Sequence, residues 1–419
     1  MKVLSGSSIC AAAALCATVT AQDWSAFRGP SGNGISGAVN VPTVWSEDQG
    51  VAWKVALPGQ SNGSPIVSAD CVFLVSAEEV GRKRHLHCFD KDDGASKWVR
   101  TIEFAKEMPT HKTNLYGGTT PAANGERVVV WHSSAGLVCY DFAGNEAWKR
   151  ELGDFRHQWG YGTSPVLHKG KVILHSGPGQ TVFVAAFDLK SGETIWQTDE
   201  PVENNGERND ANKYMGSWST PVVVTVGGQE IVVCSMATRV NGYELATGKI
   251  IWNCDGLRGE RGDLAYASPV IANDICVAMG GFKGPAIGFR MTGSGDISDR
   301  RLWRKDKANP QRIGSGVFVD GYIYMANAGV NTIECIDSAS GEPLWQQRTQ
   351  GAAHWGSLVY ADGRLYTTDQ NGNTTVFQPN AEKFELIATN RLDDPGNSTP
   401  AIIDGVIYVR TFGHLYCIR

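Results

Sequence analysis

Histidine, acidic and aromatic side chains that could do chemistry gather in a few short polar segments of the chain. The candidates for acid–base work are His111, His157, His354 and Asp263, because imidazole and carboxylate groups can exchange protons under physiological conditions. No spacing among them defines a catalytic triad, so we assign no catalytic residue. The predicted ligand-binding set is His111, Asn114, Tyr116, His157, Trp159, Tyr161, Trp218, Arg261, Asp263, Arg312, His354 and Trp355.

A tryptophan repeat indicates which structural elements position these side chains. Seven tryptophans recur at intervals of 42 to 56 residues: Trp53, Trp98, Trp148, Trp196, Trp252, Trp303 and Trp345. Most of these tryptophans follow the same motif, which consists of a small residue, an acid two positions later and a turn with glycine. Cys88, Asp90, Gly94 and Trp98 are one example. In such a turn the acid bonds backbone N–H groups while glycine takes the left-handed conformation. We expect each Trp to pack between units and to cap a backbone carbonyl.

A second motif, Ser or Thr followed mostly by Pro and then by apolar β-formers, opens each repeat. It occurs eight times, at Ser64, Thr120, Ser164, Thr220, Ser268, Ser315, Ser357 and Thr399. Each repeat predicts four short antiparallel strands, so the chain is predicted to be an all-β, eight-bladed β-propeller. The last repeat lacks a Trp strand, and residues 51–55 form a Trp strand without a repeat. The N-terminal strand should therefore complete the last blade and close the ring.

The polar segments described first fall on the crossings between the last strand of one blade and the first strand of the next. In an antiparallel blade these crossings all lie on one face of the propeller. Their side chains should therefore surround one mouth of the axial channel, which becomes the default binding site.

Over about residues 45–419, the pattern small-x-Asp-x-x-x-Gly-x-x-x-Trp resembles the tryptophan-docking repeat of the pyrroloquinoline-quinone-like (PQQ-like) propellers. This family includes quinoprotein dehydrogenases and the non-enzymatic BamB-type envelope lipoproteins. For a dehydrogenase, the resemblance implies PQQ held over a mouth Trp, with Ca²⁺ bound by acids and Asn. The candidates would be Trp159, Trp218, Trp355, Asn114 and Asp263. The sequence lacks the adjacent Cys pair of such dehydrogenases and a well-placed lipoprotein Cys.

Metal and nucleotide signatures are weak. His85 and His87 share one face of a strand, as a metal pair would, but we interpret them as part of a solvated blade edge. Residues 90–94 look like a calcium loop with the wrong spacing, and belong to the repeat's own turn. We predict no metal site. No P-loop, dinucleotide glycine fingerprint, Gly-x-Ser-x-Gly elbow or Cys-x-x-Cys is present.

Composition favours a well-packed exported protein. The 419 residues include 49 Gly and are 42% apolar, 19% charged and −5 in net charge, which argues against nucleic-acid binding. Residues 1–21 predict a secretory signal, with Lys2 ahead of a short apolar stretch and cleavage after Ala21. We therefore expect a periplasmic or secreted protein with no membrane span. Residues 22–44 should form an extension that lies across a face or seals the closure, and residues 45–419 the propeller.

Eight cysteines remain after that cleavage. Cys88, Cys139, Cys335 and Cys417 occupy equivalent positions in different blades, so they are expected to be small buried hydrophobes. The disulfide state of the other four, Cys71, Cys234, Cys254 and Cys276, stays open.

The favoured function is an exported, non-enzymatic binding or scaffold propeller of the BamB type. It would be a monomer without a cofactor that contacts an envelope protein, a glycan or a small ligand at the channel mouth. One alternative is a PQQ-dependent dehydrogenase for alcohols or sugars, the only case that needs PQQ and Ca²⁺. A second alternative is a propeller that binds or processes carbohydrate through its Trp- and Tyr-rich loops.

Overall fold

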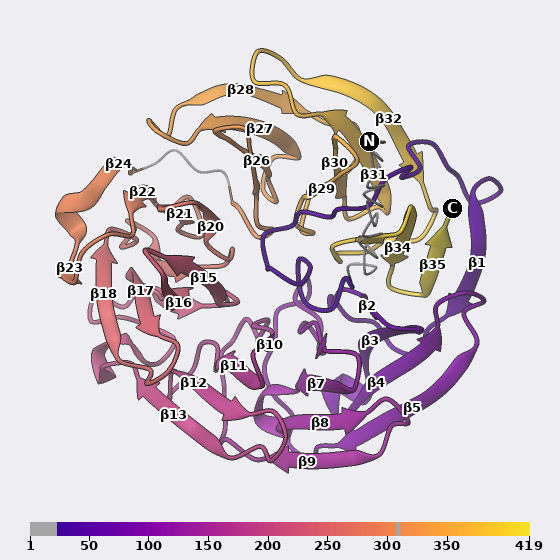
Figure 1. Cartoon of the computed structure of the whole chain (residues 1–419), viewed down its shortest axis with the longest axis horizontal. Helices are drawn as coiled ribbons and strands as arrows, with labels where there is room; N and C mark the ends of the chain where they lie inside the picture. Colours follow the sequence, from indigo (N-terminus) through magenta and orange to yellow (C-terminus); the bar gives the residue numbers. More distant parts are fainter. Residues whose placement is uncertain (1–22, 307–310) are drawn as a thin grey trace, which may run out of the picture.

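The computed structural model describes residues 23–306 and 311–419. Eight four-stranded antiparallel blades surround a central axis, as Figure 1 shows, so the predicted all-β propeller is confirmed. The described helices are four short 3-10 turns: η1 (Glu79–Gly81), η2 (Ser133–Ala135), η3 (Val202–Asn204) and η4 (Ser298–Arg300). The predicted signal segment, residues 1–21, and its cleavage after Ala21 lie outside the described residues.

The strands of each blade run outward from the axis in chain order. Blades 1 to 3 comprise β2 (Ile66–Ser68), β3 (Cys71–Glu78), β4 (Lys83–Asp90), β5 (Ser96–Glu103); β6 (Ala122–Ala123), β7 (Arg127–Trp131), β8 (Leu137–Asp141), β9 (Glu146–Arg150); and β10 (Val166–His168), β11 (Lys171–His175), β12 (Phe183–Asp188), β13 (Thr194–Asp199). Blades 4 and 5 comprise β15 (Val222–Val226), β16 (Gln229–Ser235), β17 (Arg239–Glu244), β18 (Ile250–Asp255); and β20 (Val270–Ala272), β21 (Ile275–Met279), β22 (Ala286–Arg290), β24 (Arg301–Lys305). Blades 6 and 7 comprise β25 (Val317–Val319), β26 (Tyr322–Ala326), β27 (Thr332–Asp337), β28 (Pro343–Arg348); and β29 (Val359–Ala361), β30 (Arg364–Thr368), β31 (Asn373–Gln378), β32 (Glu385–Arg391).

The eighth blade closes the ring as the sequence predicts. It contains β33 (Ala401–Ile403), β34 (Val406–Arg410) and β35 (His414–Ile418), and its outer strand is β1 (Val51–Ala56) from the other end of the chain. Trp53 of β1 pairs with Cys417 of β35 in an antiparallel register. The two ends of the propeller are thus held together by a β-ladder, which leaves no open edge at the closure.

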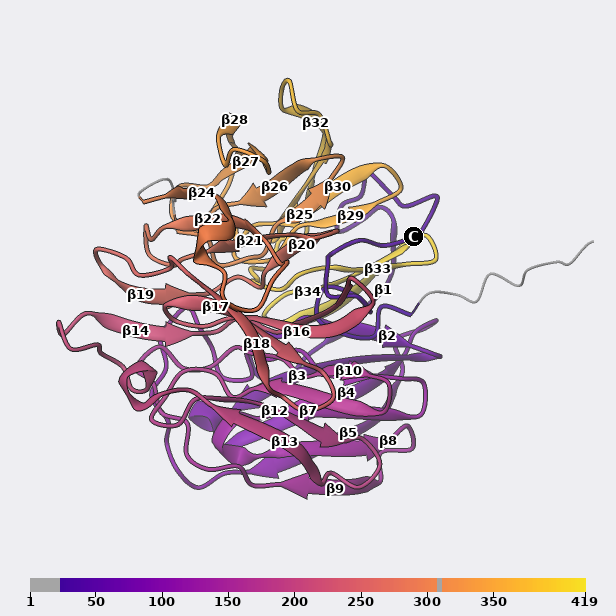
Figure 2. The same ribbon diagram turned by 60° about the vertical axis from the view of Figure 1, so that its left-hand side comes forward.

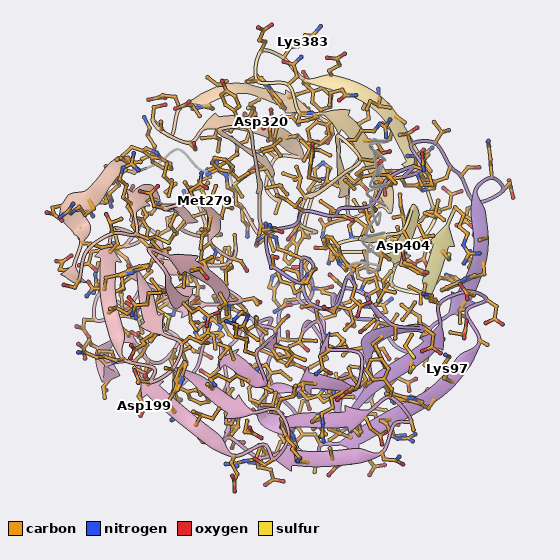
Figure 3. The ribbon with its side chains drawn as sticks, viewed as in Figure 1. Lys97, Asp199, Met279, Asp320, Lys383 and Asp404 are labelled. Carbon is orange, nitrogen blue, oxygen red and sulfur yellow. The ribbon has the colours of Figure 1, made fainter. Side chains whose placement is uncertain are left out.

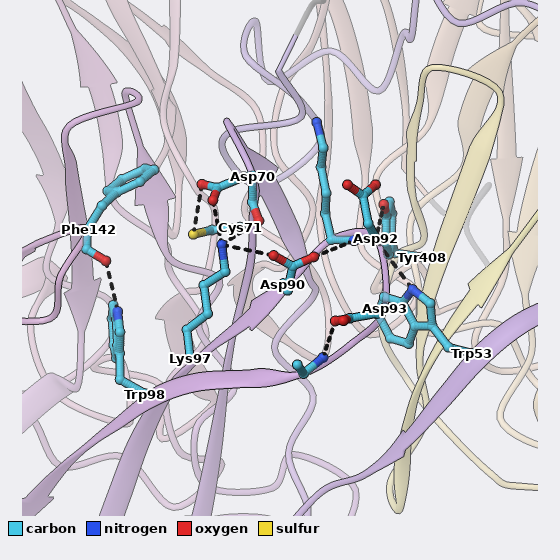
Figure 4. A network of polar contacts seen from close by, with 12 residues as sticks. Trp53, Asp70, Cys71, Asp90, Asp92, Asp93, Lys97, Trp98, Phe142 and Tyr408 are labelled. Atoms are coloured by element: carbon cyan, nitrogen blue, oxygen red, sulfur yellow. Dashed lines mark hydrogen bonds and ion pairs between the residues drawn. The ribbon is translucent and has the colours of Figure 1, made fainter.

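The repeated tryptophans join neighbouring blades. Each lies opposite the small residue of its own blade, and a Cβ added at Gly242 would overlap the Trp252 ring. The indole N–H then donates to a backbone carbonyl of the next blade, as Trp98 does to Phe142 at 2.9 Å in Figure 4. In the described residues this bond is made by six of the seven: Trp53, Trp98, Trp148, Trp196, Trp303 and Trp345. Their predicted docking role is confirmed.

Trp252 is the exception. Its indole N–H is buried and has no hydrogen-bond partner in the described part of the chain. The following blade lacks the tight Asp-x-x-x-Gly turn at this point. An inserted strand, β23 (Gly295–Asp296), instead pairs in parallel with β18 beside Trp252.

The acidic turns behave as the repeat predicts. In Figure 4 the Asp90 carboxylate accepts the Asp92 N–H at 2.8 Å and pairs with Lys97 at 3.1 Å, while Gly94 has a φ of 76°. These bonds occupy the carboxylate that a calcium loop would need. Residues 90–94 therefore serve the docking of Trp53, whose N–H reaches the Lys91 carbonyl at 3.3 Å.

The hydrophobic core lies between blades rather than at the axis. Seven clusters of buried apolar residues are described, and most join the facing sides of two adjacent blades. Figure 3 shows side chains filling these spaces, with exposed Lys383 at the outer rim. All eight described cysteines are buried and free, among them the four at equivalent positions, which confirms those as small core residues. Each blade is thus stabilised by its neighbours.

One small sheet stands outside the blades. Strands β14 (Tyr214–Ser217) and β19 (Gly262–Ala265) come from two successive crossings and pair in parallel. Figure 2 shows them projecting beyond blades 4 and 5 on the crossing face. This sheet fixes the rim of the channel mouth on that side.

Candidate functional site

An axial cavity of about 500 Å³ lies where the innermost strands begin, within the usual size range of small-ligand sites. Its wall contains one hydroxyl side chain from every blade: Ser64, Thr120, Ser164, Thr220, Ser268, Ser315, Ser357 and Thr399. These are the residues that open the eight repeats. The repeat thus builds the cavity wall as well as the blades.

The hydroxyl ring is tied together by hydrogen bonds. The backbone N–H of Ser64 donates to Thr120 Oγ1 at 3.0 Å, and that of Thr399 donates to Ser64 Oγ at 2.9 Å. The same link joins seven of the eight neighbouring pairs in the described residues. Because each oxygen in these links acts as an acceptor, its O–H remains available to donate to a ligand.

The N-terminal extension covers one end of the cavity. It crosses the axis, as Figure 1 shows, and places Phe27 in the cavity lining. Val67 N–H bonds the Trp24 carbonyl at 2.9 Å on one side, and Tyr360 N–H bonds the Gly34 carbonyl at 2.8 Å on the other. The expectation that this segment lies across a face agrees with its described part. The cavity therefore opens on the crossing face.

Arg28 clamps this extension. Its guanidinium is 1% exposed and donates to the carbonyls of Gly32 at 2.9 Å, Asn33 at 3.0 Å and, across the axis, Gly316 of blade 6. Burial lowers the pKa of Arg28 to about 9. The Arg28 guanidinium binds backbone carbonyls, and Arg28 is not among the residues that line the cavity.

One half of the mouth is aromatic. Trp159, Trp218, Tyr266 and Phe282 line this side of the cavity, whereas Trp355 lines it from the crossing that leads to blade 7, the blade that carries Gln370. The rings of Trp159 and Trp218 are 5.9 Å apart, and Tyr266 lies 5.4 Å from Trp218. Trp218 is fixed by a bond from its N–H to the Gly160 carbonyl at 2.9 Å. The cluster offers flat apolar faces that are held in place.

His157 supports this aromatic half from behind. Its Nε2 donates to the Met215 carbonyl at 3.1 Å, and its Nδ1 accepts the Trp159 N–H at 3.1 Å. The imidazole meets the Trp218 ring edge-to-face at 4.8 Å. Burial lowers the pKa of His157, so the ring is neutral and both nitrogens are engaged. This histidine positions the two tryptophans.

The other half of the mouth is a chain of carboxamides. Gln370 Nε2 donates to Asn397 Oδ1 at 3.1 Å, and Asn397 Nδ2 donates to Asn62 Oδ1 at 3.1 Å. Asn62 Nδ2 reaches Asn114 Oδ1 at 3.4 Å, and Asn114 Nδ2 donates to the Trp159 carbonyl at 2.6 Å. The chain links blades 7, 8 and 1 to the crossings that follow blades 1 and 2. Polar groups of both kinds thus surround this side.

The lining contains no Asp, Glu, Lys or Arg among the described residues. Hydroxyl, carboxamide and aromatic groups make up most of it, together with the His111 imidazole and a few small or aliphatic residues. The cavity can therefore hold a neutral ligand through hydrogen bonds and ring contacts, whereas an ionised group would enter without a countercharge.

A family model described as outer membrane protein assembly factor BamB matches residues 82–347 and 329–417. The chain belongs to this BamB family. Comparison with curated protein sequences gives no significant match. The crystal structure of BamB from Moraxella catarrhalis is similar with a TM-score of 0.60 and 15% identity, covering 87% of this chain and 97% of that one.

Dehydrogenase structures share the fold of this BamB-family chain as well. A europium-containing methanol dehydrogenase has a TM-score of 0.68 and 12% identity, covering 94% of this chain and 98% of that one. The quinohemoprotein alcohol dehydrogenase from Comamonas testosteroni has a TM-score of 0.67 and 13% identity, covering 94% and 80%. At these identities the likeness shows the fold alone.

Five of the twelve predicted binding residues line the cavity of the BamB-family propeller: His111, Asn114, Trp159, Trp218 and Trp355. Seven lie outside the lining: Tyr116, His157, Tyr161, Arg261, Asp263, Arg312 and His354. The tyrosines bind the crossing loops, with Tyr116 donating to the Met108 carbonyl at 2.6 Å and Tyr161 Oη accepting the Gly117 N–H at 3.2 Å. Arg261 is exposed, 5.6 Å from the Phe282 ring.

The charged and buried candidates are occupied by protein partners. Arg312 pairs with Glu334, both nearly fully buried. Asp263 accepts bonds from Asn209 at 2.9 Å and Arg258 at 3.1 Å. His354 contacts Thr349 Oγ1 at 2.9 Å, and burial lowers its pKa to about 4.

The interpretation of His85 and His87 as a solvated blade edge is wrong. Both are buried in β4, with exposed fractions of 6% and 1%. His87 Nε2 lies 2.8 Å from Ser76 Oγ, and burial lowers its pKa to about 3. Strand β4 is covered on both sides by blade packing, which the alternation of the sequence does not reveal. No group of three metal-ligating side chains occurs in residues 23–306 or 311–419.

Several lining residues went unrecognised in the sequence. In the sequence the hydroxyl residues mark only the start of each repeat, although their period of one per blade is the signal that could have placed them at the axis. Asn62, Gln370 and Asn397 carry no motif and meet only because the ring closes. The position of Phe27 depends on the path of the extension, which no local pattern predicts.

Proposed function

We propose that this BamB-family chain is a non-enzymatic binding propeller that acts outside the cytoplasm, with the axial cavity as its ligand site. The observation that carries the proposal is the lining, which offers hydroxyl, carboxamide and aromatic groups but no described carboxylate, ammonium or guanidinium. Of the four acid–base candidates, His157, His354 and Asp263 are engaged outside the cavity. The fourth, His111, lines the cavity, where its Nδ1 lies 2.7 Å from Thr113 Oγ1 and no carboxylate accompanies it in the described lining. Such a site favours binding over proton transfer.

The dehydrogenase alternative requires a site for PQQ and Ca²⁺. PQQ carries carboxylates, which call for cationic partners, and Ca²⁺ prefers carboxylate and carbonyl oxygens. The described lining contains neither cations nor carboxylates, so these residues do not fit the cofactor pair. Asp263, the proposed acid for that alternative, is held by Arg258 outside the lining. We derive no redox step for this chain.

The proposed setting is the cell envelope. No helix among the described residues is long and apolar enough to cross a membrane. Contact with an envelope protein is supported by the family description as an outer membrane protein assembly factor. We propose in addition that the protein is an exported monomer without a cofactor. The predicted export signal and the three-part division into residues 1–21, 22–44 and 45–419 belong to this proposal.

Cofactor loading tests the non-enzymatic proposal. Residues 22–419 would be incubated with PQQ and Ca²⁺, desalted, and examined by absorbance and thermal unfolding. We expect no retained quinone absorbance and an unchanged midpoint, because a ligand of the native state must raise stability. Retained absorbance together with a raised midpoint would contradict the proposal and would call for alcohol and sugar oxidation assays.

A further inference from the structure

We propose that the axial cavity binds the end of a neutral, polyhydroxylated glycan. This inference rests on the proposed binding function and names the chemical class of its ligand. It depends on three features of the cavity: its two unlike halves, a described lining without Asp, Glu, Lys or Arg, and its single open end.

The two halves match the two kinds of surface on a sugar ring. A pyranose has patches of C–H groups that pack on flat aromatic rings, here Trp159 and Trp218, with Trp355 as a further ring on the crossing that leads to blade 7. It also has an edge of hydroxyls, each of which donates and accepts hydrogen bonds. The carboxamides of Asn62, Gln370 and Asn397 present amide donors and carbonyl acceptors opposite the aromatic side.

The hydroxyl ring extends this match into the cavity. The seven oxygens that already accept a backbone N–H leave their own protons to donate. Donors without fixed partners suit a ligand rich in oxygen acceptors. An apolar ligand would displace water from these hydroxyl groups without replacing the hydrogen bonds that the water makes to them.

Charge and shape argue against a peptide terminus. The N-terminal extension at Phe27 and Arg28, here called the strap, covers one end of the cavity. A linear ligand must therefore enter with its end first. A peptide end brings an ammonium or a carboxylate into a lining with no described countercharge, at a large cost in free energy. The non-reducing end of a neutral glycan brings only hydroxyls.

The same lining favours binding over hydrolysis. Glycosidases generally place two carboxyl groups on either side of the scissile bond. The described lining contains none, and the nearby Asp263 is 2% exposed and paired with Arg258 at 3.1 Å. The glycan is therefore held and not cleaved.

A glycan array with neutral and acidic oligosaccharides tests the inference, followed by titration of the best neutral binder through tryptophan fluorescence. Residues 22–419 should bind neutral glycans, with an affinity that changes less than about twofold between low and high salt. Trp355→Ala should weaken binding about tenfold, since it removes one stacking face, and Trp355→Phe should restore much of it. The Trp355 side chain makes no hydrogen bond within the described residues, and thermal unfolding checks that each variant folds.

A matched pair of glutamines separates the site from the surface. Gln370→Ala removes a lining carboxamide and should weaken binding about three- to tenfold, whereas Gln347→Ala on the exposed strand β28 should leave it unchanged. Equal effects of the two variants, no neutral binder on the array, or a preference for acidic glycans would each overturn the glycan inference. Binding of an internal peptide loop at the mouth would overturn it while leaving the binding function intact. Retention of PQQ would instead contradict the proposed function itself.

Discussion

The contrast between Trp196 and Trp252 gives a quantitative test of how the blades are joined. Both side chains are buried on the outer strand of their blade, opposite Ala186 and Gly242. Trp196 donates to the Leu245 carbonyl of the next blade at 3.0 Å, whereas the buried Trp252 N–H has no partner among the described residues. Replacing each by Phe keeps an aromatic ring and removes the N–H.

The expected magnitudes follow from these contacts. Both variants lose part of the indole and leave a small void, a shared cost of about 1–2 kcal/mol. Trp196→Phe also loses a buried hydrogen bond, about 1 kcal/mol, whereas Trp252→Phe relieves an unpaired donor and regains about 1–3 kcal/mol. Trp196→Phe should therefore be the less stable variant by about 2–4 kcal/mol.

Urea unfolding of the mature protein, followed by far-ultraviolet circular dichroism, measures the difference. The midpoints should separate in this order while the slopes stay equal, which shows that only stability has changed. Equal midpoints, or a greater loss in Trp252→Phe, would refute the role assigned to the indole hydrogen bond.

Three further predictions follow from burial and from the chain's start. Burial lowers the pKa of five histidines: His87, His132, His157, His175 and His354. Because the unfolded chain then binds protons that the folded chain does not, the free energy of unfolding should fall as the pH drops below about 6.5. The expected loss is up to about 1.4 kcal/mol per pH unit for each of these histidines. Urea midpoints at pH 7, 6 and 5 should show this slope, and an unchanged slope in His354→Asn would contradict it. A thiol reagent should label no cysteine in the native mature protein and all eight after unfolding, and fewer than eight would reveal a disulfide. Mass spectrometry of the exported protein should give Gln22 as the first residue, and retention of residues 1–21 would contradict the predicted signal.

The repeat explains why the fold could be predicted in such detail. A propeller depends on short sequence motifs that recur in each blade. The spacing of the tryptophans from Trp53 to Trp345 therefore predicts the number of blades and the order of their strands. Closure through β1 followed because the last repeat lacked its own Trp strand. Trp252 departs from the pattern because the insertion around β23 replaces the tight turn that would supply its acceptor.

The site was predicted less fully, since its residues meet only through ring closure. The sequence predicts that the crossings surround one mouth of the channel, as they do in the structure, but it does not show that His157 and His354 face the protein rather than the cavity. Burial decides that outcome, and it depends on neighbours that are distant in sequence. Asn397 becomes a site residue through its bond to Asn62, 335 positions away in the sequence, and Gln370 joins the site through its bond to Asn397.

Hydrogen exchange is the most direct test of the central claim that the axial cavity is the ligand site. The mature protein would be compared with and without the neutral oligosaccharide that binds best on the array. Protection is expected in the crossings around residues 111–118, 157–162 and 354–357, with no change in outer strands such as β13 and β28. Protection confined to the outer strands or to the turns at the strap end would contradict the account.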